Sequence, residues 1–193
     1  MRDLANKQKI VEFMRAFGRL ARNEAEVFLT GGSTAVLEGW RDSTADIDLK
    51  FVPELDELFR GIPAIKESLM LNVELASPPD FIPELPGWRD RCTYIGSEGK
   101  VSFYSYDPYS QALSKIERGH EKDVLDVRAM FDRKLIEPAK LVELFTQIGA
   151  KAYTSIPQLM QNHSLKRFDV QSKNGNSAGV PFPSEVGVKK PAG

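Results

Sequence analysis

The stretch that decides the fold runs from Phe28 to Phe51 and reads FLTGGSTAVLEGWRDSTADIDLKF. A short apolar run ends in a pair of glycines, which predicts a strand followed directly by a turn. The next residues favour a short helix over 33–38, and 46–52 again has the pattern of a strand. The sequence therefore predicts a strand, a glycine turn, a helix and a second strand that begins with the triplet Asp-Ile-Asp.

The two carboxylates of that triplet indicate a metal site. Successive side chains of a strand point to opposite faces, so Asp46 and Asp48 project to the same side. Two carboxylates held side by side repel each other unless a cation lies between them. Hard divalent cations such as Mg²⁺ prefer oxygen ligands and often combine a few carboxylates with substrate phosphates. The pair therefore looks like half of a metal site.

The glycine turn indicates a phosphate site. Gly31 and Gly32 have no Cβ and let a ligand approach the backbone, and the following helix offers unpaired N–H groups at its start. Ser33 adds a hydroxyl there, either for a phosphate or as a simple helix cap. A phosphate cradle beside a metal-binding pair implies a nucleoside triphosphate with Mg²⁺.

The spacing of these elements resembles the polymerase-beta-like nucleotidyltransferase superfamily. Gly32-Ser33 is followed after twelve residues by Asp46-Ile47-Asp48, and the strand–glycine–helix–strand context matches that signature. The resemblance implies an α/β (α+β) nucleotidyltransferase fold, with a small mixed β-sheet flanked by helices and a C-terminal helical bundle. It also implies Mg²⁺ as cofactor, with two ions expected and Mn²⁺ as the alternative metal.

Two further stretches resemble the abortive-infection branch of that superfamily, the toxins of type IV toxin–antitoxin systems and their bacterial relatives. They are GWRDSTADIDL and ALSKIERGHEKDVLDV. The resemblance implies that Lys115 is catalytic and binds the triphosphate with Arg118, and that Asp123 supports them. It implies a bacterial toxin that transfers a nucleoside monophosphate to an RNA (tRNA) or protein acceptor and that has a cognate antitoxin protein.

Other reasoning from the residues leaves alternatives open. Lys115 and Arg118 are three apart on an expected helix and share a face, which is either a phosphate site or an ordinary solvated face. Glu74 is expected as the third carboxylate, a metal ligand and base for the acceptor hydroxyl, or else as a surface residue. Arg41 is expected either to contact phosphate or to pair with Asp42 or Asp46.

Composition fits an enzyme of the cytoplasm. The 193 residues include 27 acidic and 26 basic side chains, so no overall charge points to nucleic acid. Cys92 is the only cysteine, which excludes an intrachain disulfide and favours a reducing compartment. No run approaches the ~20 apolar residues of a membrane span, so no membrane partner is expected.

The chain order predicts three parts. Residues 1–107 are expected to form the α/β core, 108–170 a helical part, and 171–193 a disordered tail because that composition buries little apolar surface. The alternative to an enzyme is a non-catalytic nucleotide-binding module, regulatory or antitoxin-like, whose motif would look the same with one ligand lost.

Overall fold

The computed structural model describes residues 2–149, which form a mixed sheet with helices on both sides. Two sheets are present in this part of the chain, one of five strands and one of two. The strands are β1 (Ala5–Asn6), β2 (Ala25–Thr30), β3 (Ser43–Thr44), β4 (Asp46–Val52), β5 (Asn72–Glu74), β6 (Thr93–Glu98) and β7 (Val101–Ser105). The helices are α1 (Lys7–Gly18), α2 (Gly32–Leu37), α3 (Asp56–Ser68), α4 (Pro108–Arg118), α5 (Glu121–Asp132) and α6 (Pro138–Gln147), with 3₁₀ turns η1 (Pro78–Asp80) and η2 (Arg89–Arg91).

The larger sheet places the predicted carboxylates on neighbouring strands. Its order is β5-β4-β2-β7-β6, with β4 antiparallel to β2 and parallel to β5. In this register Asp48 lies between Thr30 of β2 and Glu74 of β5. The mixed sheet with its flanking helices confirms the expected nucleotidyltransferase fold class.

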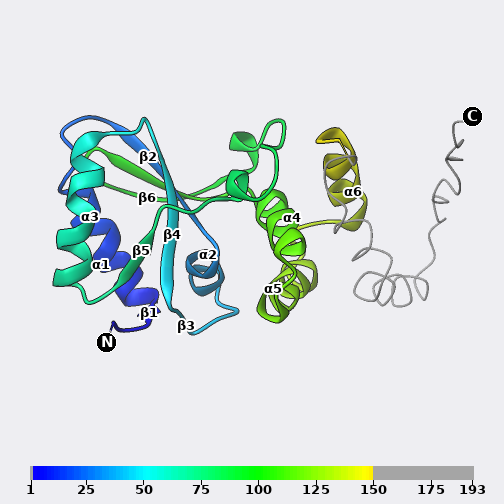
Figure 1. Ribbon diagram of the computed structural model, residues 1–193, viewed down its shortest axis with the longest axis horizontal. Coiled ribbons are helices and arrows are strands. Elements are labelled where there is room, and N and C mark those ends of the chain that lie inside the picture. Colours follow the sequence, from blue (N-terminus) through cyan, green and yellow to red (C-terminus); the bar gives the residue numbers. More distant parts are fainter. Residues whose placement is uncertain (1, 150–193) are drawn as a thin grey trace, which may run out of the picture.

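The sheet separates two apolar cores. Along β4 the apolar residues Ile47, Leu49 and Phe51 are buried in the core that α1 and α3 cover. Phe28 of β2, on the other face, belongs to a second core formed with α4, α5 and α6. Figure 1 shows α1 and α3 at one side of the molecule and α4–α6 at the other. Asp46 and Asp48 therefore face away from α1 and α3, toward the side on which α4 and α5 lie.

Two expectations for the helices are corrected. Gly61 and Pro63 predict an interruption in the helix of this stretch, yet α3 runs unbroken from Asp56 to Ser68. Proline costs a helix one hydrogen bond, but the burial of Leu58, Ile62 and Ile65 on one face outweighs that loss. The helical spacing of apolar residues near the N-terminus predicts a helix over 4–22, but α1 spans only Lys7–Gly18. It begins at Lys7 because Asn6 caps it by accepting a hydrogen bond from the Lys9 amide.

Some expectations fall on residues 150–193, outside the described part of the chain. They are a further helix that the sequence predicts from Pro157 to about Phe168, the boundary at residue 170 and the disordered tail over 171–193. In the part that is described, no helix is long and apolar enough to cross a membrane.

Candidate active site

The carboxylate face of β4 and β5 is held together by an asparagine amide. Asp46, Asp48 and Glu74 lie on one face of the two parallel strands, because Asp48 pairs with Glu74 in register. Asn72, two residues before Glu74, pairs with Asp46. Its Nδ2 donates to Asp46 Oδ1 at 2.6 Å and to Glu74 Oε1 at 2.9 Å. The sequence alternation that selected Glu74 also contained Asn72, whose role as a bridge between carboxylates we did not foresee.

Asp48 is the most perturbed carboxyl group of the site. Burial and the neighbouring charges of Asp46 and Glu74 raise its pKa from 3.8 to about 6, while Arg118 and Lys115 act to lower it. Four other side chains singled out from the sequence therefore lie close enough to influence the Asp48 carboxyl group. The net upward shift of the pKa means that negative charge at Asp48 lacks sufficient compensation from the protein alone.

The glycine turn packs directly against this carboxylate. Gly31 has φ +63°, and a Cβ added there would lie only 2.3 Å from Asp48 Oδ2. At Gly32 a Cβ would lie 2.0 Å from the Thr44 hydroxyl oxygen. Both positions therefore need glycine, the first for its backbone conformation as well as its space. Ser33 is fully buried and its Oγ has no hydrogen-bond partner among the described residues.

Gln111 of α4 fixes the glycine turn and was not predicted. Its Oε1 accepts from the Gly31 amide at 3.0 Å and from Thr34 Oγ1 at 2.8 Å, while its Nε2 donates to the Tyr106 carbonyl. Gln111 is one helical turn before Lys115, so one face of α4 carries both residues. The four-residue spacing from Lys115 is therefore the sequence signal that could have identified Gln111.

Lys115 lies in a buried network of ion pairs. Only 4% of it is exposed, and its Nζ donates to Asp126 Oδ2 at 2.7 Å and to Asp123 Oδ1 at 3.4 Å. Asp126 also accepts both arms of Arg41, at 2.9 and 2.8 Å. The structure therefore pairs Arg41 with Asp126 of α5 rather than with the expected Asp42 or Asp46, because α5 packs beside the loop that precedes β4.

Arg118 is the more accessible cation. Its side chain is 32% exposed, and its Nη2 donates to Asp123 Oδ1 at 2.6 Å. The guanidinium also lies over the ring of Phe81, 5.0 Å from the centroid. Asp123 Oδ2 is buried and accepts no hydrogen bond from the described residues. The network thus contains three cations and two carboxylates, and its surplus positive charge lies toward Asp48.

Asp46 and Asp48 form a pair of carboxylates that fits a divalent metal, but they do not form a complete coordination shell. Among residues 2–149, no group of three or more His, Cys, Asp or Glu side chains is arranged to hold a metal ion. Asp46 and Asp48 are nevertheless two carboxylates on one face of a strand, and Mg²⁺ commonly binds through one or two carboxylates together with substrate phosphates. The raised pKa of Asp48 agrees with a site that gains from a cation.

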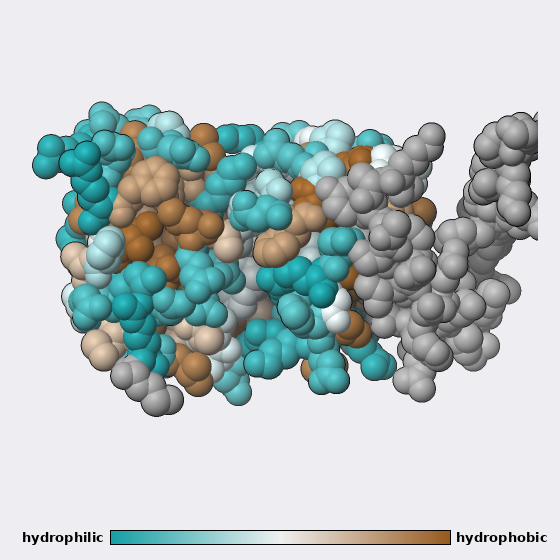
Figure 2. Space-filling model, viewed as in Figure 1, coloured by the Kyte–Doolittle hydropathy of each residue, from teal (hydrophilic) through white to brown (hydrophobic). Residues whose placement is uncertain are grey.

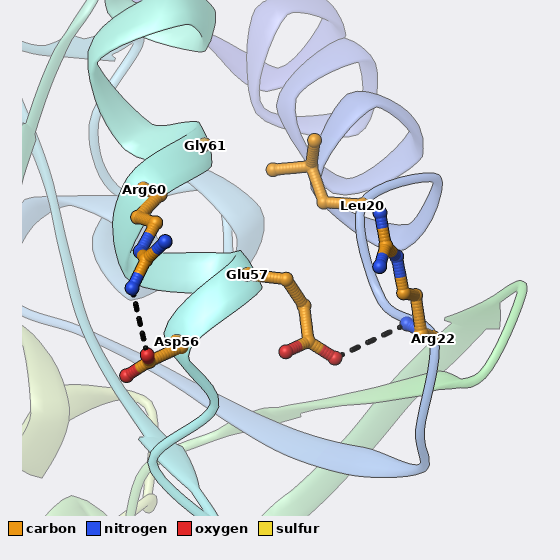
Figure 3. A pocket seen from close by; sticks show the side chains of 6 residues that line it. All are labelled: Leu20, Arg22, Asp56, Glu57, Arg60 and Gly61. Carbon is orange, nitrogen blue, oxygen red and sulfur yellow. Dashed lines mark hydrogen bonds and ion pairs between the residues drawn. The ribbon is translucent and has the colours of Figure 1, made fainter.

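A hollow between the ends of α1 and α3 contains none of these residues (Figure 3). It measures about 440 Å³, and charged side chains around it pair with one another. Arg60 donates to Asp56 at 3.0 Å, and Glu57 accepts from the Arg22 amide at 3.4 Å. Its own polar groups therefore satisfy each other, and the acidic face of β4 stays the candidate active site.

Comparison with protein families assigns the chain to a class. The family described as "Nucleotidyltransferase of unknown function (DUF6036)" matches residues 8–173, which is most of the chain. The chain therefore belongs to this nucleotidyltransferase family. Comparisons with curated proteins and with solved structures find no match. The family match spans β4, β5, α4 and α5, the elements that carry the site.

Proposed function

We propose that this protein is an Mg²⁺-dependent enzyme that transfers a nucleoside monophosphate from a nucleoside triphosphate to an RNA (tRNA) or protein acceptor. One observation carries the proposal. Asp46, Asp48 and Glu74 share one face, and Arg118 and Lys115 lie near enough to act on the pKa of Asp48. Carboxylates with cations nearby suit the binding of a metal together with a triphosphate.

The reaction is a displacement at the α-phosphorus. The acceptor hydroxyl oxygen forms a bond to that phosphorus while the bond to the bridging oxygen of the β-phosphate breaks, and pyrophosphate leaves. We assign Glu74, which is exposed and pairs with Asp48 in register, to take the proton of the acceptor hydroxyl. Mg²⁺ bound by Asp46 and Asp48 would supply charge neutralisation and Lewis-acid polarisation of the phosphate.

Arg118 and Lys115 have different roles in this proposal. We assign Arg118 to the triphosphate because its side chain is partly exposed and its planar fork matches phosphate oxygens. Lys115 is almost completely buried and held by Asp126 and Asp123, so we assign it to orienting these groups and to the local positive potential. The sequence alone had suggested Lys115, rather than Arg118, as the main contact of the triphosphate.

We extend the proposal to the biological role of the protein on the basis of the motifs at 39–49 and 112–127 alone. On that basis the protein is the toxin of a bacterial toxin–antitoxin or antiphage system, with an antitoxin protein as partner. Induced expression in a bacterial host should then stop growth, and Asp48→Asn should restore it. Equal growth arrest by the wild-type protein and Asp48→Asn would separate any toxicity from this site.

The activity is tested with labelled substrate. The protein is incubated with each α-labelled triphosphate, Mg²⁺ and total bacterial RNA or protein, and label and pyrophosphate are measured. We expect label in one acceptor class and an equal amount of pyrophosphate, both absent in Asp48→Asn. Tight Mg²⁺-dependent triphosphate binding with no labelled acceptor would favour the non-catalytic nucleotide-binding module instead.

A further inference from the structure

The edge of the sheet next to the candidate active site is only half covered. β5 pairs with β4 from Asp46 to Asp48 and ends at Glu74. From Leu49 to Val52, β4 pairs with β2 on one side, and no described strand lies beside it on the other. Backbone groups at such an edge can accept another strand, and proteins usually cover or protect them.

A groove of about 270 Å³ with both apolar and charged residues in its lining includes residues of this free edge. Three consecutive residues of β4, from Leu49 to Phe51, line it together with Phe59 of α3 and Leu75. Phe59 and Leu75 are 37% and 49% exposed, although both are large hydrophobic residues. Figure 2 shows hydrophobic side chains gathered on this face between α3 and β4. The groove thus joins unpaired strand backbone to exposed apolar surface, the two features that a strand with apolar side chains would cover.

The wall opposite α3 is held in shape by a local hydrogen bond. Ser77 and Asp80 line the groove, and Asp80 Oδ2 accepts from the Ser77 amide at 2.7 Å. Pro79 lies between them and restricts the backbone further. A preformed wall lowers the ordering cost for a segment that docks against it.

One segment outside the described residues has the pattern this groove requires. Residues 180–188 read VPFPSEVGV, with apolar side chains at 180, 182, 186 and 188. This period of two places them on one face of a strand. Pro181 and Pro183 lack N–H groups, and in a strand both would leave the same edge without a hydrogen-bond donor. Such a strand can pair well along one edge only, which is the situation at the border of a sheet.

Length and charge allow the same chain to supply this strand. Thirty residues separate Gly149 from Val180, and an extended chain of that length spans up to ~100 Å, more than the protein requires. The groove carries Glu54 and Asp80 against one Lys50, and the segment is followed by Lys189 and Lys190. The basic end thus complements the acidic excess of the groove.

We propose that residues 180–188 of this chain bind the free edge of β4 as an additional strand, with Phe182 between Phe59 and Leu75. The docked strand lies in line with β5 and fixes Leu75, the neighbour of Glu74. It would hold the strand end that carries the third carboxylate. The inference is an alternative to the disordered tail expected over 171–193, since composition averaged over that stretch conceals the alternation at 180–188.

Hydrogen exchange of the full chain tests the proposal. We expect Phe182→Ser to speed exchange of the amides in 49–52 that point away from β2 by ~10-fold or more. Glu185→Ser, on the opposite face of the segment, should leave those amides unchanged. Amides of β2 report whether the fold is intact in both variants. Equal exchange at 49–52 in wild type and Phe182→Ser would overturn the proposal.

Covalent trapping identifies the occupant directly. In a Cys92→Ser background, full-length protein with Leu75→Cys and Ser184→Cys, which keeps Phe182, should form an intrachain disulfide under mild oxidation, whereas Leu75→Cys with Gln171→Cys should not. Products are separated by size on non-reducing gels across a ten-fold dilution. Only dimeric product, or protection at 49–52 that is lost on dilution, would mean that a second copy supplies the strand and would overturn the intrachain assignment. Neither readout depends on triphosphate or acceptor, so this proposal can fail while the proposed function stands.

Discussion

The acidic face of β4 and the charged network of α4 and α5 differ in how their buried charges are compensated. On β4, Asp48 lies between Asp46 and Glu74, and the main close contact among these carboxylates is the neutral amide of Asn72. In the helical network each carboxylate meets a cation, as Asp126 meets Lys115 and Arg41. One region therefore lacks positive charge, whereas the other supplies its own.

This difference indicates that the acidic face of β4 is the ligand-binding site, and that the network of α4 and α5 supports it structurally. Unbalanced buried charge costs stability and persists where a ligand completes it. A paired buried network gains rigidity, and removing one partner leaves the other uncompensated. Substitutions of the carboxylates on β4 should therefore remove activity while stabilising the protein. Substitutions at Lys115 should mainly destabilise it.

The largest effect is expected for Asp48→Asn. Transfer should fall by ~1,000-fold or more, because the pair that holds the cation is broken. The free energy of unfolding should rise by up to roughly 3 kcal/mol at pH above 6, since the folded protein no longer bears that charge. Chemical denaturation and transfer assays on the same preparations measure both.

The pH dependence gives this prediction its sign. The folded pKa of Asp48 is raised, so protonation stabilises the wild type, and that contribution is lost as pH rises from 3.8 through about 6. The stability advantage of Asp48→Asn should shrink to zero below that window. A variant less stable than the wild type at pH 7.5 would show that the carboxylate is not under repulsion.

Lys115→Met should act mainly on stability. It removes a cation that is 4% exposed and leaves Asp123 and Asp126 short of a partner, a loss of ~3–5 kcal/mol for a broken buried pair. Asp126→Asn in the same chain should recover part of that loss, because it removes the charge left behind. Unchanged stability of Lys115→Met with transfer reduced ~100-fold would instead make Lys115 a direct contact of the triphosphate.

Arg118→Met should separate function from stability in the network. We expect transfer to fall by ~100-fold with weaker triphosphate binding, because a partly exposed fork for phosphate is lost. The unfolding free energy should change little, since Asp123 keeps Lys115 as a partner. Arg128→Met, an exposed arginine of α5, is the matched control for loss of charge alone.

The smallest effect is expected for Asn72→Leu. Its amide orients Asp46 and Glu74 without taking part in the chemistry, so Mg²⁺ affinity should fall by ~10-fold. Asn72→Gln keeps the amide and should recover part of that affinity, which a purely steric role would not allow. Calorimetric titration of Mg²⁺ in the presence of a non-hydrolysable triphosphate measures the change.

The sequence predicted the strands of the site better than its side-chain partners. The spacing from Gly32-Ser33 to Asp46 marked the fold class, because strand alternation and glycine turns are local properties. Asn72 and Gln111 escaped notice because their roles depend on register between strands and on packing of α4 against the turn. Arg41 was placed with its neighbours in sequence, while its partner Asp126 lies 85 positions further along the chain. Such contacts arise from tertiary packing, which no local pattern encodes.

The pKa of the Asp48 carboxyl, followed by carbon NMR with and without Mg²⁺ and a non-hydrolysable triphosphate, tests the central claim most directly. Without metal we predict a value of about 6, raised by burial and by Asp46 and Glu74. With Mg²⁺ and the triphosphate analogue bound, the pKa should fall by several units, because the cation supplies the charge that the protein lacks. A pKa that starts near 3.8, or that does not move when Mg²⁺ and the analogue are added, would contradict the assignment of this face as the metal-dependent site.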